Sequence, residues 1–255
     1  FIVGIPYAVM AAMILANTGN SEKSLALINS VGAVGGVIGG LAMSAWGGPK
    51  RRVHGVLGGW FISSLLGLVV MGLGRDLIAW SVAAFFGSFF IPIINGSNQA
   101  IWQAKVPPDL QGKVFSIRRL IAWFVSPAAM LVAGPLADKV LEPAMRLETS
   151  PLATSVGWLV GTGPGRGMAL MFLVGGLMAA GLMVTGYFIP VLRRAEDLIP
   201  DHDTVPPAAP VNERLERLQG LLALRQKLIA QPHSYERELA LKAVANDLRR
   251  LGSSS

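Results

Sequence analysis

Long apolar runs separated by short polar segments fill the first 194 residues of the chain. A helix needs about 20 mostly apolar residues to cross a hydrocarbon core about 30 Å thick, and no run alternates like a barrel strand. The pattern predicts an all-α integral membrane fold, a bundle of six transmembrane helices over residues 1–194. The apolar runs lie at residues 1–16, 25–46, 53–73, 77–102, 120–137 and 167–192, and the fifth span is placed at 115–137.

The pattern changes after the last run. Residues 195–211 are predicted to be a linker, because 205–210 hold three prolines that favour an extended chain. Two amphipathic segments follow, separated by Gln231 and Pro232, and predict a cytoplasmic helical hairpin over 212–252. The hairpin either packs on itself or docks on the membrane unit, a partner or anionic lipid. Its apolar faces are predicted to contain Leu215, Leu218, Leu222 and Ile229 on one helix, and Leu241, Val244, Leu248 and Leu251 on the other.

Composition argues against several classes of functional site. The chain is 52% hydrophobic and 15% charged, and it has no cysteine, which excludes disulfides and thiolate metal sites. The scattered His54, His202 and His233 do not suggest a zinc site. No Ser-His-Asp or paired-carboxylate arrangement is apparent within the spans, so neither an enzyme nor a cofactor or metal is expected. The net charge of +7 gathers largely at the ends of spans, so no nucleic-acid partner is expected.

Lysine and arginine divide unequally between the two sides that the six spans define. One side receives nine of them and the other receives five. The richer side is predicted to be cytoplasmic, together with the C-terminus. The nine are Lys50, Arg51, Arg52, Lys105, Lys113, Arg118, Arg119, Arg193 and Arg194. Because residue 1 is not methionine and the first apolar run begins there, we expect the chain to be a piece of a longer protein.

The fourth span carries most of the polar groups that lie inside the membrane. Pro92 is predicted to kink this helix, because proline removes a backbone hydrogen bond. Carboxamides are costly in lipid, so this polar face is predicted to line a substrate cavity, the alternative being hydrogen bonds that join helices. The cavity candidates are Asn95, Asn98, Gln99, Trp102 and Gln103, with Asn29 and the weaker Ser30 in the second span.

Glycines recur through the second span. Gly32, Gly36 and Gly40 repeat every four residues, with Gly35 and Gly39 alongside them. Such small-residue spacing allows close contact between helices. It predicts either a static packing ridge or a smooth face on which helices slide during transport.

Residues 40–52 form a glycine-rich loop that contains Gly40 and Gly47 and ends in Lys50, Arg51 and Arg52. This loop resembles the one that the major facilitator superfamily repeats in each six-helix half. The acidic residue of that motif is Ser44 here. Residues 101–119, 133–138 and 142–145, and the exit segment 195–203, are similar to the bacterial efflux-type branch of macrolide and siderophore exporters.

The resemblance covers residues 1–203 and fits the C-terminal six-helix half of a twelve-helix fold. It implies a secondary transporter of a bacterial inner membrane, an efflux permease or antiporter for an amphipathic small molecule that works by alternating access. An N-terminal six-helix half and the lipid bilayer would be its partners. The middle third of each span holds no Asp, Glu, Lys, Arg or His, so a proton-coupling group is expected in the missing half.

The same loop and the start of the fifth span supply candidate gating residues. Lys50, Arg51 and Arg52 are predicted either to interact with helix ends and acidic groups or to act only as topology anchors. Arg118 and Arg119 are predicted either to take part in gating on the same cytoplasmic side or to anchor the helix by extending toward lipid headgroups. The alternative function is a non-transporting membrane scaffold or sensor that acts through its helical tail.

Overall fold

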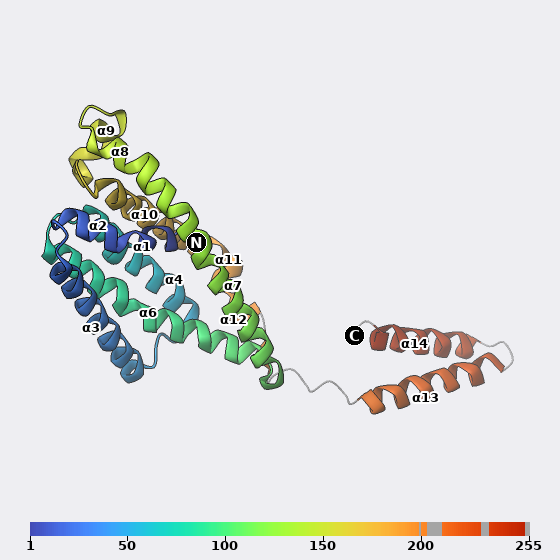
Figure 1. The fold of residues 1–255 in the computed structure, drawn as a ribbon. Helices are drawn as coiled ribbons and strands as arrows, with labels where there is room; N and C mark the ends of the chain where they lie inside the picture. The colour runs from blue at the N-terminus through green and yellow to red at the C-terminus, as the bar shows by residue number, and fades with distance from the viewer. Residues whose placement is uncertain (199, 203–210, 231–234, 253–255) are drawn as a thin grey trace. The chain divides into compact units, whose positions relative to one another are not determined.

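A computed structural model describes residues 1–198, 200–202, 211–230 and 235–252, and the chain divides into two compact units, 1–204 and 205–255. The described residues form helices and no strand (Figure 1). In the first unit the helices are α1 Gly4–Ala8, α2 Met10–Asn17, α3 Glu22–Trp46, α4 Arg52–Ser63, the π-helix η1 Ser64–Val69, α5 Val70–Leu73, α6 Leu77–Lys105, α7 Pro108–Pro135, the π-helix η2 Leu136–Leu141, α8 Glu142–Arg146, α9 Pro151–Val160, α10 Arg166–Phe188, α11 Pro190–Arg193 and α12 Ala195–Leu198.

Five continuous helical stretches of the described residues are long and apolar enough to cross a membrane. They are Glu22–Trp46, Arg52–Leu73, Leu77–Lys105, Pro108–Arg146 and Arg166–Phe188. Side-chain caps begin two of them: the Ser21 hydroxyl accepts a hydrogen bond from Ser24 N–H at 3.2 Å, and Asp76 accepts one from Ala79 N–H at 2.8 Å. The chain is therefore a multi-pass helical membrane protein.

The start of the chain differs from its prediction. A single span over 1–16 is not confirmed, because Val9 (φ −107°, ψ 6°) separates α1 from α2, and six membrane-length helices are not confirmed either. Gly4 and Pro6 are poor helix formers, which weakens the first turn. Pro6 instead packs on α10, where a Cβ atom on Gly175 would lie 3.2 Å from the Pro6 ring.

The fifth span is longer than predicted. Instead of 115–137, one helical stretch runs from Pro108 to Arg146 through η2. The short helix α9 then follows where a loop was expected, and Ser150 caps its start by accepting from Ala153 N–H at 3.1 Å. Arg75 donates to the carbonyl oxygens of Trp158 and Leu159 at the other end of α9.

The two π-helical segments were not predicted. Such segments often mark functional or tightly packed positions. In η1, Gly67 crosses Gly87 of α6 so closely that a Cβ atom on Gly67 would lie 2.8 Å from the Gly87 Cα. The Ser63 hydroxyl next to η1 donates to the Gly87 carbonyl at 3.2 Å, which joins the same crossing.

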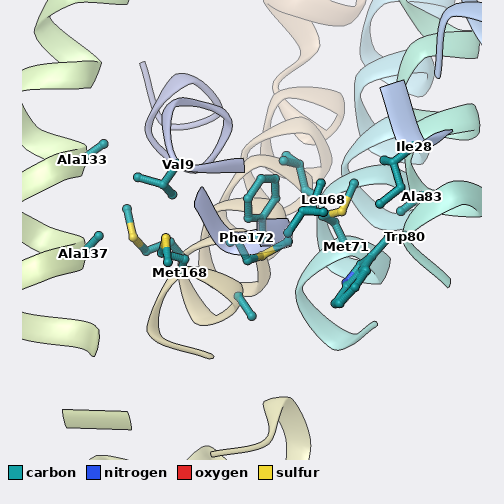
Figure 2. Packing of buried hydrophobic residues seen from close by; sticks show 14 residues of the cluster. Val9, Ile28, Leu68, Met71, Trp80, Ala83, Ala133, Ala137, Met168 and Phe172 are labelled. Atoms are coloured by element: carbon teal, nitrogen blue, oxygen red, sulfur yellow. The ribbon is translucent and has the colours of Figure 1, made fainter. Parts of the chain in front are cut away.

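The main core joins α2, α3, η1, α5, α6, α7, η2 and α10. Figure 2 shows Phe172 of α10 within this cluster, near Leu68 and Met71. Ala133 and Ala137 project into it from α7 and η2 (Figure 2). Because lipid is as apolar as these side chains, close van der Waals packing holds this core together.

The predicted glycine packing face exists on α3, but a different set of glycines forms it. Gly35 and Gly39 face α6, where a Cβ atom on either would overlap the carbonyl of Phe85 or Phe89. Gly32 belongs to this buried face. Around Gly36 and Gly40 a Cβ atom would meet nothing within 4 Å. The packed set is therefore Gly32, Gly35 and Gly39 rather than Gly32, Gly36 and Gly40.

The second unit contains α13 Val211–Ala230 and α14 Tyr235–Gly252, which pack on each other. On α13, Leu218, Leu221 and Leu228 are half-buried, whereas Leu215, Leu222 and Ile229 are 51%, 49% and 53% exposed, so its packed face is shifted from the predicted one. On α14, Leu241, Val244 and Leu248 face inward as predicted. The Leu251 side chain, Gln231, Pro232 and the linker residues 203–210 lie outside the described residues.

Candidate functional site

The amide face of α6, defined by Asn95, Asn98, Gln99, Trp102 and Gln103, is largely open. Asn95, Gln99 and Gln103 are exposed, and Asn98 and Trp102 are half-buried. Within the described part of the chain, the side chains of Asn95, Asn98 and Gln99 have no hydrogen-bond partner. These amides do not join helices of this unit, so they are available to another molecule or segment.

This face is open because α6 is packed on its other two sides. On one side α3 approaches through Gly35 and Gly39. On the other side α4 approaches so closely that a Cβ atom on Gly59 would lie 2.7 Å from Ile94 Cγ1. Pro92 does not end the helix, which continues from Leu77 to Lys105.

A second open face lies on α3. It carries the exposed Asn29, together with Gly36 and Gly40. Gly35 contacts Phe85 and Gly39 contacts Phe89, so the two helices run parallel, and the helical repeat then directs both open faces to the same side of the unit. Asn29 and the amide face therefore share one surface. Ser30 is a weaker candidate, because its hydroxyl donates to the Ala26 carbonyl at 2.8 Å.

The two arginines at the start of α7 point in different directions. The Arg118 guanidinium lies 4.2 Å from the ring centroid of Trp102, so it meets the amide face in a cation–π contact. Arg119 lies 5.7 Å from the ring of Trp123 on its own helix, and Trp123 is 70% exposed. Arg118 is thus part of the candidate site, and Arg119 faces the surroundings.

Residues after the last long helix contact the ends of α4 and α6, although a linker was predicted there. The Glu196 carboxylate accepts a hydrogen bond from Val53 N–H, in the first turn of α4, at 2.7 Å. Lys105 at the end of α6 donates to the Glu196 carbonyl and lies 2.7 Å from Asp201. A His202 ring nitrogen lies 3.0 Å from the Ala104 carbonyl. We call these contacts of residues 196–202 the exit clasp.

The exit clasp also includes a contact with the glycine-rich loop of residues 40–52. Arg51 pairs with Asp197 at 3.6 Å, so the carboxylate that meets this loop comes from α12, whereas Ser44 is exposed. Gly47 ends α3 with φ 76°, a left-handed conformation that favours glycine, and its N–H donates to the Met43 carbonyl. Lys50 and Arg52 are exposed.

Within the exit clasp, the pKa of Asp201 is lowered. The hydrogen bond from Lys105 lowers the pKa of the Asp201 carboxyl from its ordinary value, and the Lys105 charge adds to this effect. Asp201 therefore carries its negative charge at neutral pH and holds Lys105 at the end of α6.

Glu142 has a structural role that the sequence did not reveal. The residue is 6% exposed, and its carboxylate accepts hydrogen bonds from Gly165 N–H and Met168 N–H, both at 3.0 Å, at the start of α10. A carboxylate is favourable there because it satisfies free N–H groups and the helix dipole. Gly165 lies 23 residues from Glu142 in the sequence, so no local pattern indicates this contact, which joins α8 to α10. Among the described residues, no group of three or more His, Asp or Glu side chains could hold a metal ion.

Comparisons with known proteins give a distant relationship. The chain is 24% identical over 110 residues to macrolide efflux protein A of Streptococcus pyogenes, and equally to the protein of that name from serotype M6. The match covers 42% of this chain and 27% of each relative, so it spans about a quarter of the relatives' length. No protein-family profile matches the chain, and no solved structure matches it. The chain is thus a multi-pass helical membrane protein with a distant relative named as an efflux protein.

Proposed function

We propose that this chain is one half of a secondary active efflux transporter of the major facilitator type, acting on an amphipathic small molecule. The observation that carries the proposal is the surface shared by the open amide face of α6 and the open face of α3. The distant similarity to a macrolide efflux protein supports export as the direction.

The amide face suits a ligand that is partly polar and not strongly charged. Asn and Gln each offer donors and an acceptor, so they can bind hydroxyl, carbonyl and amine groups alike. Trp102 and Ile91 add apolar surface on the same side of the helix. Arg118, which lies over the Trp102 ring, adds one positive charge to this surface.

The packing of the unit supports alternating access. Gly35 and Gly39 lock α3 to α6, while Gly36 and Gly40 stay open. In this proposal the first pair keeps the half rigid, and the second pair forms a smooth surface for the opposite half. The N-terminal half would complete the cavity, and the exit clasp would face the cytoplasm of a bacterial inner membrane.

Two amide variants test the proposal in the complete protein. Asn95→Ala and Gln99→Ala should each change the export of amphipathic dyes from cells by about two- to tenfold, since a lost hydrogen bond is worth about 0.5–1.5 kcal/mol. Asn246→Ala, an exposed amide of α14, is the matched control and should leave export unchanged. Normal export by both α6 variants at normal membrane abundance would remove the amide face from the transport site.

A scaffold or sensor is the second candidate. The observation that favours it is the separate unit of α13 and α14, whose exposed leucines include Leu215, Leu222 and Leu224. Deleting residues 204–255 discriminates between the candidates. A transporter keeps its export after this deletion, whereas a sensor loses its output.

A further inference from the structure

A cavity of about 460 Å³ lies between α4 and α10, away from the amide face. Leu57 and Phe61 of α4 and Met183 and Val184 of α10 form its apolar wall. Cavities of about 300–1,000 Å³ are the usual size of small-ligand sites. The helices that line it are long and apolar enough to cross a membrane, and Phe188 in its lining is 77% exposed.

One end of this cavity is polar and positively charged. The His54 ring centroid lies 5.6 Å from that of Tyr187, and both residues line the cavity. The Arg193 guanidinium lies 5.9 Å from the same tyrosine ring, which places a cation at the cavity mouth. Over the ranges that the structure describes, Arg193 has no carboxylate within 4.0 Å. Within those ranges, no carboxylate therefore pairs with its charge.

Gly58 leaves the cavity open. It lines the wall, and a Cβ atom added there would meet nothing within 4 Å. A larger side chain at this position would fill the space without a clash against backbone. Gly181 of α10 is equally unobstructed but does not line the cavity, so it offers a matched position.

We propose that this cavity binds an anionic phospholipid from the membrane leaflet whose headgroups lie at the level of His54, Tyr187 and Arg193. One acyl chain lies against Leu57, Phe61 and Met183, and the phosphate accepts hydrogen bonds from Arg193 and His54. Arginine matches phosphate geometry, an imidazole N–H donates, and tyrosine is common at the level of headgroups. The combination of an apolar wall with an unneutralised cation fits a lipid better than a free anion or an uncharged chain.

The test uses the delipidated full-length protein in detergent, titrated with phosphatidylglycerol, phosphatidylcholine or inorganic phosphate and followed by native mass spectrometry. Phosphatidylglycerol should bind the wild-type protein at least about tenfold more tightly than phosphatidylcholine, because charge-assisted hydrogen bonds are the stronger ones. Arg193→Gln should remove most of that preference, and Gly58→Leu should lower binding of both lipids. The matched variants Arg194→Gln and Gly181→Leu should behave as wild type.

Other occupants give other results, each of which contradicts the proposal. Equal binding of the two lipids would mean that only an acyl chain is recognised. Displacement of phosphatidylglycerol by inorganic phosphate at equal concentration would mean a simple anion site. Equal losses in Arg193→Gln and Arg194→Gln would mean a diffuse surface charge effect. None of these results depends on whether the amide face binds a transported molecule.

Discussion

The contact of Glu142 with the start of α10 gives a prediction whose size follows from the structure. Removing the carboxylate by Glu142→Ala leaves the N–H groups of Gly165 and Met168 without their acceptor in a buried place. Each unsatisfied buried group costs about 1–3 kcal/mol, and loss of a charge at a helix N-terminus costs about 0.3–1 kcal/mol more. Allowing for partial access of water, we expect the free energy of unfolding to fall by about 2–4 kcal/mol.

The assay is denaturant unfolding of the purified full-length protein in mixed micelles, followed by circular dichroism. Glu142→Gln keeps one acceptor oxygen and should lose about half as much stability. Glu148→Ala is the control, because Glu148 is exposed and, among the described residues, accepts only from the Thr162 hydroxyl at 3.5 Å. If Glu142→Ala stays within about 0.5 kcal/mol of the wild type, the range of ordinary surface changes, the capping argument is wrong.

Two further predictions concern the helix contact and the exit clasp. Gly39→Ala should destabilise the protein by about 1–3 kcal/mol, because its Cβ atom would overlap the Phe89 carbonyl, whereas Gly40→Ala, whose Cβ atom would meet nothing within 4 Å in this unit, should destabilise it less in the same unfolding assay. Equal effects of the two would contradict the phase of the glycine face. Lys105 lowers the pKa of Asp201, so the stabilisation is present above the ordinary carboxyl pKa of about 3.9 and is lost as the pH falls through the lower folded value. Asp201→Asn should therefore reduce the fall in melting temperature below about pH 4, and an unchanged acid limb would contradict this.

The apolar pattern predicted most of the long helices, because length and hydropathy are properties of the segments themselves. Three of the predicted spans, 25–46, 53–73 and 77–102, lie within helices that the structure extends by up to three residues, whereas the predicted span 167–192 runs past the end of α10 at Phe188 into α11. The first span failed because α1 and α2 separate at Val9, close to the contact of Pro6 with Gly175. Hydropathy carries no information on such a contact.

Contacts between segments could not be predicted from the sequence. Both Gly36 with Gly40 and Gly35 with Gly39 have the spacing of a packing face, and only the position of α6 decides between them. The sequence placed Arg118 and Arg119 on one side of the membrane, but the rotation of α7 that directs only Arg118 to Trp102 is a tertiary property.

The candidate site was predictable to the extent that it depends on one helix. The amides of α6 share a face because of the helical repeat, and they remain open because glycines of α3 and α4 pack on the other sides. The exit clasp was hidden because Glu196 and Asp201 follow a span and precede a proline-rich segment, which is typical of a linker. Their partners, Val53 and Lys105, are far away in the sequence.

The central claim is that these helices cross a bilayer with the glycine-rich loop of residues 40–52 and the exit clasp on the cytoplasmic side. The chain has no cysteine, so single substitutions in it can be labelled specifically. In intact cells, an impermeant maleimide should label Thr162→Cys, which is exposed in the connection between α9 and α10, and should label Lys50→Cys only after the membrane is opened. Labelling of Lys50→Cys in sealed cells, or of both positions alike, would contradict the account.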